Sequence, residues 1–164
     1  MERILVSACL MGRRVRFDGA AKTSTSSLLA TWREEGRLVP FCPEVEGGLA
    51  IPRPAAEIVG GDGSAVLAGE ARVMTAGGGD VTAAFLSGAR QALELARSQG
   101  IRMAILKEGS PSCGSLVVHS GDFTGTKVPG HGVTTALLES HGIRVFAEDS
   151  LDAALAHLRT LEAR

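Results

Sequence analysis

The segment that decides the fold is VTAAFLSGARQALELARSQGIRMAILK, residues 81–107. Its first part, 81–99, has apolar residues at the spacing of an amphipathic helix. These residues are Val81, Phe85, Ala89, Leu93 and Ala96. Asp80 can cap the start of this helix, and Gly100 can end it. The second part, IRMAILK, is continuously apolar, which predicts a strand buried on both faces of a parallel sheet.

The same alternation of strand and helix extends over the rest of the chain. Short apolar runs predict strands at 3–8, 38–42 and 143–147, although Pro40 weakens the second because proline cannot donate a backbone hydrogen bond. Helical spacing predicts helices at 26–35, 133–142 and 150–161. We therefore expect a single α/β domain over 1–164, with a mostly parallel sheet covered by helices on both faces, a Rossmann-like three-layer sandwich.

One region does not follow this alternation. Residues 60–79 are rich in glycine, and within them the run 66–75 is expected to form either a small hairpin or an irregular excursion. Further along, the segment PGHGVTT, 129–135, leads into a predicted helix, so its backbone N–H groups could hold an anion. His131 in this segment is expected to be a solvent-exposed loop residue rather than a ligand or a base.

Composition limits the classes of function that the chain can have. Of the 164 residues, 45% are hydrophobic and 21% are charged, as is usual for globular proteins. The formal net charge of −1 gives no overall basic field, so nucleic-acid binding is not expected. No apolar run approaches the roughly 20 residues needed to span a bilayer. The beginning, MERILVSACLMGRR, lacks the long apolar core of a signal peptide, so we expect a cytoplasmic protein.

The three cysteines of the chain are expected at one edge of the sheet. Cys9 follows the first predicted strand, Cys42 ends the second, and Cys113 lies in the loop after the IRMAILK strand. Ligand sites of open parallel sheets lie beyond the carboxyl ends of the strands. The three thiols are therefore candidate ligands of a metal centre at this edge.

Several interpretations of the cysteines stay open on spacing alone. Each thiol could be a small buried hydrophobic side chain, and one could be a catalytic nucleophile without a metal. A disulfide would be unusual in a reducing compartment and would leave one cysteine over. Zinc accepts three cysteines plus a histidine or water. A [4Fe–4S] cluster normally takes four cysteines, so three would leave one iron open.

Polar residues beside the cysteines are candidates for proton transfer. Glu44 lies two positions after Cys42, and Ser110 and Ser112 come just before Cys113. A carboxylic acid and a hydroxyl group near a metal could move protons and orient a substrate. Each also has a plainer interpretation: Glu44 could be an exposed loop carboxylate or a helix cap, and Ser110 an ordinary turn residue. Asp18 could orient a ligand or cap the turn that it forms with Gly19.

Five groups of motifs carry a resemblance to a known family. They are Ser7-Ala8-Cys9-Leu10-Met11-Gly12; Arg16-Phe17-Asp18-Gly19; Cys42-Pro43-Glu44-Val45 with Gly47-Gly48-Leu49 and Pro52-Arg53; Lys107-Glu108-Gly109-Ser110-Pro111-Ser112-Cys113-Gly114; and Gly130-His131-Gly132-Val133-Thr134. In this order they resemble the 2-thiouracil desulfurase family over almost the whole chain. The common pattern has leucine and tyrosine where this chain has Met11 and Phe17, and loss of the phenol could alter substrate contacts.

The resemblance implies a cofactor and a reaction. Cys9, Cys42 and Cys113 would bind a [4Fe–4S] cluster whose fourth iron captures the sulfur of a thiolated pyrimidine. Water would replace that sulfur without net redox chemistry, giving uracil and sulfide. Glu44 would be the acid/base carboxylate and Ser110 the assisting serine, with Ser112 as the alternative serine.

Four further residues are predicted to form the substrate pocket. They are Asp18, Gly47, Gly48 and Lys107. The predicted partner is a small thiolated pyrimidine base or nucleotide. Three other functions remain as alternatives: the same cluster acting on thiolated RNA, a non-catalytic iron–sulfur or zinc-binding protein, and a sulfurtransferase that works through a cysteine persulfide.

Overall fold

A computed structural model describes residues 1–14, 16–18 and 26–163. Its centre is a four-stranded sheet in the order β2-β1-β5-β8, in which every neighbouring pair is parallel. The strands are β1 (Ile4–Ser7), β2 (Leu38–Phe41), β5 (Met103–Leu106) and β8 (Arg144–Ala147). Because β2 is an edge strand, it accommodates Pro40, which has no N–H group to donate.

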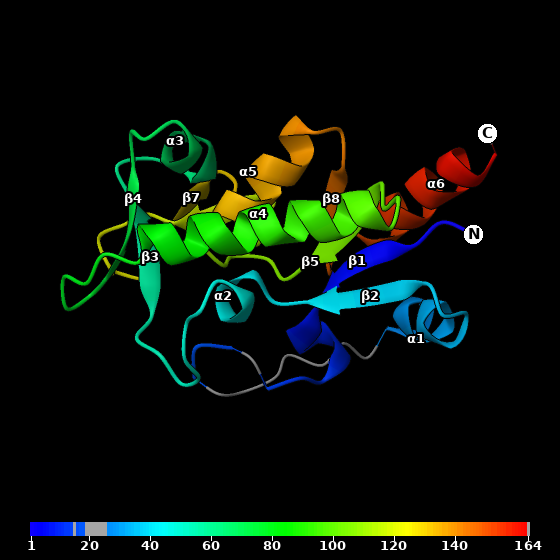
Figure 1. The fold of residues 1–164 in the computed structure, drawn as a ribbon, viewed down its shortest axis with the longest axis horizontal. Helices are drawn as coiled ribbons and strands as arrows, with labels where there is room; N and C mark the ends of the chain where they lie inside the picture. Colours follow the sequence, from blue (N-terminus) through cyan, green and yellow to red (C-terminus); the bar gives the residue numbers. More distant parts are fainter. Residues whose placement is uncertain (15, 19–25, 164) are drawn as a thin grey trace.

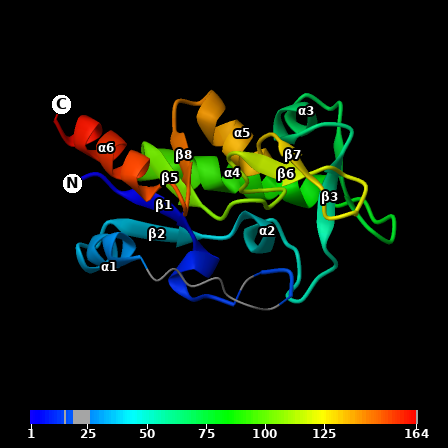
Figure 2. The same ribbon diagram turned by 180° about the vertical axis from the view of Figure 1, so that it is seen from behind.

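Helices cover both faces of this sheet, which confirms the three-layer prediction. One face packs against α4 (Thr82–Ser98) and α5 (Val133–Ser140). The other packs against α1 (Ser27–Glu34) and α6 (Leu151–Glu162). Figure 1 shows α4 lying along the sheet, and Figure 2 shows the molecule from behind.

Alternation along the two central strands explains this arrangement. Leu5 and Ala104 belong to the core under α4 and α5, whereas Ile4, Val6 and Met103 belong to the core under α1 and α6. Successive strand side chains point to opposite faces, so a run that is apolar at every position fills both layers. Ser26 is the N-cap residue of α1 and accepts a hydrogen bond from the Leu29 backbone. The predicted cap of α4 is displaced by one residue: Val81 is its N-cap, and Asp80 accepts a hydrogen bond from the backbone of Thr82, the first residue of the helix.

Two small antiparallel sheets extend the molecule beyond the carboxyl ends of the central strands, at the end far from both termini in Figure 1. In one, β3 (Ala56–Val59) pairs with β4 (Arg72–Thr75). In the other, β6 (Val117–His119) pairs with β7 (Lys127–Pro129). Helix α3 (Gly63–Leu67) lies between β3 and β4 in the chain.

The predicted hairpin within 66–75 is wrong. Residues 66 and 67 end α3, and β4 pairs with β3, a strand that the sequence pattern did not reveal. Asp62 explains the start of α3, since its side chain accepts hydrogen bonds from Ser64 and Ala65. The short helices η1 (Ala8–Met11) and α2 (Pro43–Glu46) were also missed, because one turn gives no periodic pattern.

Close backbone contacts lock these parts together. A Cβ atom on Gly63 would lie 2.2 Å from the Gly132 carbonyl oxygen, so α3 and the start of α5 meet backbone to backbone. A Cβ on Gly88 of α4 would lie 1.9 Å from the Pro43 carbonyl oxygen, which brings α2 equally close to α4.

Within the described ranges, no helix is both long and apolar enough to cross a membrane.

Candidate active site

A cavity of about 490 Å³ lies beyond the carboxyl ends of β1, β2 and β5. The small sheets contribute its other side through β3, β6 and β7. All three cysteines line the cavity, together with Glu44, Ser110, Ser112 and Lys107. The structure therefore brings together residues that are up to 104 positions apart in the chain, as their places at the strand ends predicted.

Each cysteine is held by a different element. Cys9 lies in η1, Cys42 is the N-cap residue of α2, and Cys113 lies in the turn after β5. No disulfide joins the three, all of which lie in the described part of the chain. Burial raises the pKa of Cys9 to about 11, and burial also raises the pKa values of Cys42 and Cys113. Without a metal, the buried thiols therefore stay protonated at neutral pH.

The donor set fits a cluster better than a single ion. Among the described residues, no three Cys, His, Asp or Glu side chains are grouped closely enough to hold one metal ion. A mononuclear zinc site needs all its ligands within about 2.0–2.3 Å of one atom. A [4Fe–4S] cluster binds each thiolate at a different iron, so its cysteines can stand farther apart around one cavity. Three convergent soft sulfur donors are of this second kind.

Glu44 lines the cavity and is held there by the side chains of three residues. Arg53 donates to Glu44 Oε1 from Nε and Nη2, at 3.2 and 3.1 Å. Ser110 and Ser112 donate from Oγ to Glu44 Oε2, at 3.2 and 3.1 Å. The side chains of Arg53 and Glu44 are only 6% and 16% exposed, so this ion pair is largely shielded from solvent. One oxygen of Glu44 is thus fixed by a cation and the other by hydroxyl groups.

The two serines have different surroundings. Ser110 Oγ accepts hydrogen bonds from the backbone N–H groups of Ser112 and Cys113, at 3.0 and 3.1 Å, so this hydroxyl also builds the turn. Ser112 is fully buried, and its Oγ lies 3.3 Å from Cys113 Sγ. The two hydroxyl oxygens are 2.9 Å apart. Both serines therefore belong to the Glu44 network, and geometry alone does not separate their roles.

The start of α5 holds the Cys113 turn from a second side. The N–H groups of Gly132, Val133 and Thr134 donate to the carbonyl oxygens of Gly114, Pro111 and Ser112, each at 2.8 Å. A Cβ on Gly132 would lie 2.5 Å from the carbonyl carbon of Ser112, so glycine is needed for this approach. These N–H groups bind the protein's own backbone, which contradicts the expectation that they could hold an anion. His131 donates its N–H to Asp62 and is not among the described residues that line the cavity.

The four predicted pocket residues lie in different places. Lys107 lines the cavity, and its Nζ is 3.0 Å from Glu148 Oε2. Asp18, Gly47 and Gly48 are not among the described residues that line it. Gly47 instead packs against α4, where a Cβ would lie 2.1 Å from the Ala84 carbonyl oxygen, and Gly48 adopts a φ of +98° after α2. Gly19, which completes the predicted turn, lies outside the described residues.

Sequence reasoning missed several residues of the cavity. Arg53 belongs to a quoted motif but received no role, although it is the ionic partner of Glu44. Glu57, His119 and Lys127 also line the cavity, as does Phe17, whose possible contact with substrate the sequence did suggest. His119 and Lys127 come from β6 and β7, and neither strand was predicted. An arginine nine residues after an acidic residue is a weak signal, because only the fold brings the two together.

The fold and the cavity together define a class of protein: an α/β enzyme with a cysteine-lined site at the carboxyl edge of its parallel sheet. The model of the 2-thiouracil desulfurase family matches residues 4–150, and the chain belongs to that family.

Two similar proteins cover almost the whole chain. The solved structure of a [4Fe-4S]-dependent thiouracil desulfidase, TudS, is 49% identical, with a TM-score of 0.89, and the match covers 98% of this chain and 99% of that one. The uncharacterized protein YbbK of Bacillus subtilis (strain 168) is 43% identical over 152 residues, which are 93% of this chain and 99% of YbbK.

Proposed function

We propose that this protein is a [4Fe–4S]-dependent desulfurase that converts 2-thiouracil, or a related thiolated pyrimidine base or nucleotide, to the oxygen analogue and sulfide. The observation that carries the proposal is the convergence of three thiols and the Glu44 network on one cavity. Family membership and the likeness to a thiouracil desulfidase support the same chemistry. The reaction exchanges sulfur for the oxygen of water, so it needs no external oxidant or reductant.

Cys9, Cys42 and Cys113 would hold the cluster through their thiolates. When bound, the cluster supplies a thiophilic, Lewis-acidic iron that no cysteine of this chain occupies. The raised pKa values of the thiols mean that cluster assembly must displace three protons from them.

Glu44 is the residue that we assign to proton transfer. Its Oε2 accepts hydrogen bonds from the hydroxyl groups of Ser110 and Ser112, so a proton taken from the attacking water can reach this oxygen directly or through a serine. Arg53 fixes the other oxygen and keeps the carboxylate oriented toward the turn. The proton held on Oε2 is then available to the departing sulfide.

Lys107 and Phe17 are proposed to contact the substrate. Lys107 lines the cavity. Its ammonium group contacts Glu148 and the Glu108 carbonyl oxygen, and with three donors it can also donate to a carbonyl oxygen or ring nitrogen of the pyrimidine. Phe17 is 39% exposed and also lines the cavity, so its ring offers an apolar surface for a planar base. Lysine provides polarity, and phenylalanine provides contact area.

Anaerobic purification and one variant test this proposal. We expect a brown protein with about four iron and four sulfide per chain, which consumes 2-thiouracil and releases uracil and sulfide in equal amounts. Glu44→Gln preserves the shape of the side chain but removes the base. It should retain the cluster and lower kcat by roughly 10²–10⁴-fold.

The controls separate this proposal from its alternatives. Glu94→Gln, on α4 and outside the cavity lining, should leave kcat unchanged. A colourless protein that holds one zinc would overturn the proposal, as would full activity in Glu44→Gln. Activity that survives removal of the metal by a chelator would instead support the persulfide mechanism.

A further inference from the structure

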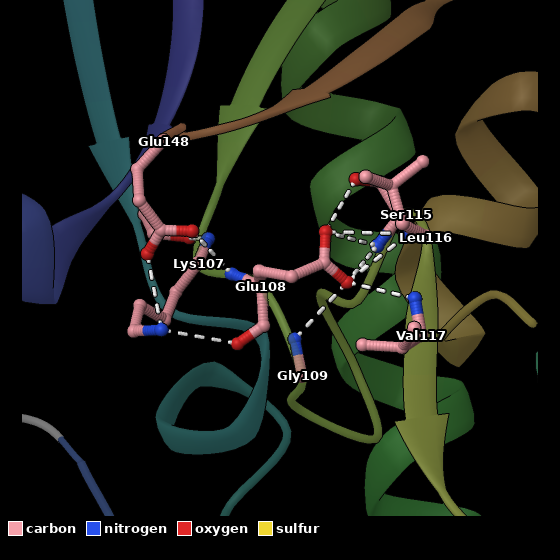
Figure 3. A network of polar contacts seen from close by, with 8 residues as sticks. Lys107, Glu108, Gly109, Ser115, Leu116, Val117 and Glu148 are labelled. Carbon is pink, nitrogen blue, oxygen red and sulfur yellow. Dashed lines mark hydrogen bonds and ion pairs between the residues drawn. The ribbon is translucent and has the colours of Figure 1, made fainter. Parts of the chain in front are cut away.

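We propose that Glu108 is a positioning residue that closes the loop carrying Cys113, so that the third cysteine and both serines are held at the cavity before the cluster binds. This inference rests on the proposed function, because it assigns Cys113 to the cluster. The loop, defined here as residues 109–117, begins after β5 and ends in β6. Figure 3 shows Glu108 with its partners in this loop.

Glu108 accepts hydrogen bonds from both ends of the loop. At the near end, Gly109 donates its N–H at 3.2 Å. At the far end, the N–H groups of Ser115, Leu116 and Val117 donate to Oε1 at 3.1, 3.0 and 3.0 Å. The Ser115 hydroxyl adds a fifth donor, at 2.8 Å from Oε2. One carboxylate therefore ties the entry of the loop to its exit.

The charge of Glu108 suits this task. Burial favours the neutral form, but the hydrogen bonds from Val117, Ser115, Leu116 and Gly109 outweigh burial and lower the pKa of this carboxyl group. Glu108 is therefore an ionised acceptor at neutral pH. Hydrogen bonds to a charged group are stronger than those between neutral groups, so a single ionised side chain can hold both ends of the loop firmly.

The central sheet in turn holds Glu108 in place. Its backbone N–H donates to Glu148 Oε1 at 2.8 Å, and Glu148 directly follows β8. The preceding N–H, that of Lys107, donates to Ser7 Oγ at the end of β1, also at 2.8 Å. Contacts from β1 and β8 thus flank the end of β5, and the loop is built on three neighbouring strands rather than on one.

Cys113 lies in the part of the chain between the two tied ends. Its backbone N–H donates to Ser110 Oγ, and its carbonyl oxygen accepts a hydrogen bond from Thr135 Oγ1 at 2.9 Å. None of these backbone contacts involves the thiol of Cys113. The backbone of Cys113 is therefore held without any use of its thiol, and a ligand residue whose backbone is fixed beforehand loses less conformational entropy when it binds.

The test compares Glu108→Ala and Glu108→Gln with Glu139→Gln in the full-length protein. Glu139 also accepts a backbone N–H, that of Val145, but it is not among the described residues that line the cavity. In cluster-free protein, Glu108→Ala should raise amide hydrogen exchange over 109–117 by at least about tenfold. Cys113 should react faster with a thiol reagent, while exchange in α6 stays unchanged.

Cluster uptake then shows whether the closure matters for the site. After reconstitution with iron and sulfide, Glu108→Ala should lose its visible absorbance at least about tenfold faster than the wild type and the Glu139→Gln control. Glu108→Gln keeps one carbonyl acceptor, so its rate of absorbance loss should lie between those of Glu108→Ala and the wild type. This variant also provides the test if the alanine variant does not fold. Unchanged exchange over 109–117, or a mobile loop with unchanged cluster lifetime, overturns the proposal. A wild type that binds no cluster would refute the proposed function instead, since the exchange and thiol measurements do not need one.

Discussion

Glu44 and Glu108 are two carboxylates that serve the same cysteine turn in opposite ways. The partners of Glu44 are side chains: the guanidinium of Arg53 and the hydroxyl groups of Ser110 and Ser112. Four of the five donors to Glu108 are backbone N–H groups. Hydroxyl groups both donate and accept protons, whereas a peptide N–H does not give up its proton. Donor type therefore distinguishes the carboxylate that we propose for proton transfer from the one that we propose to hold the chain.

Removing the cation from Glu44 should give the largest change in stability. In Arg53→Met the carboxylate stays buried without its ionic partner, and we expect the free energy of unfolding to fall by about 3 kcal/mol. The double variant Glu44→Gln/Arg53→Met should recover part of this loss, because no charge is then left uncompensated. Urea denaturation of the three variants measures both values. Equal stability of Arg53→Met and the wild type would show that the pair is solvated.

Acid should lower the stability of the protein through Glu108, by a smaller amount than the Arg53 substitution does. The pKa of Glu108 is lower in the folded protein than its ordinary value of 4.5, so its stabilisation is complete above that value and is lost as the pH falls through the folded pKa. The melting temperature of the wild type should therefore drop more steeply below about pH 5 than that of Glu108→Gln. Parallel curves for the two cluster-free proteins would contradict the assignment.

The smallest effects are expected from two serine substitutions, one beside each carboxylate. Ser112→Ala removes a hydroxyl from Glu44 and should lower kcat by about tenfold. Ser115→Ala removes a hydroxyl from Glu108, and the Ser115 backbone N–H remains as a donor. It should lower stability by about 1 kcal/mol without changing kcat. Steady-state kinetics and thermal melts on both variants measure these two effects. A lower kcat in Ser115→Ala with an unchanged kcat in Ser112→Ala would contradict the roles given to the two carboxylates.

The central sheet could be predicted from the sequence because its signals are local. Residues 81–107 contain a complete helical pattern and a run that is apolar at each strand position, and both became elements close to the predicted bounds. The ends of the strands then placed Cys9, Cys42 and Cys113 at one edge without any knowledge of contacts. Parallel topology converts positions in the chain into positions in space, and this made the candidate site predictable.

The remainder depends on contacts between distant segments. Arg53 reaches Glu44 only because the chain returns after α2, and β4 pairs with β3 across the intervening α3. Glu108 offers no local sign of its role, since its donors include residues seven to nine positions further on. A carboxylate that binds backbone N–H groups has no characteristic partner in the sequence. Residues of this kind become visible only when the fold is known.

The contact between Gly63 and Gly132 has a consequence for redesign of the protein. It joins the β3–β4 unit to the start of α5, and α5 in turn carries the Cys113 turn through three backbone hydrogen bonds. A designer who grafts a different 56–75 segment to change the substrate must therefore keep glycine at the position equivalent to Gly63. A methyl group there would push on the turn that carries Cys113 through the start of α5. The segment 56–75 is thus coupled mechanically to the turn that carries Cys113.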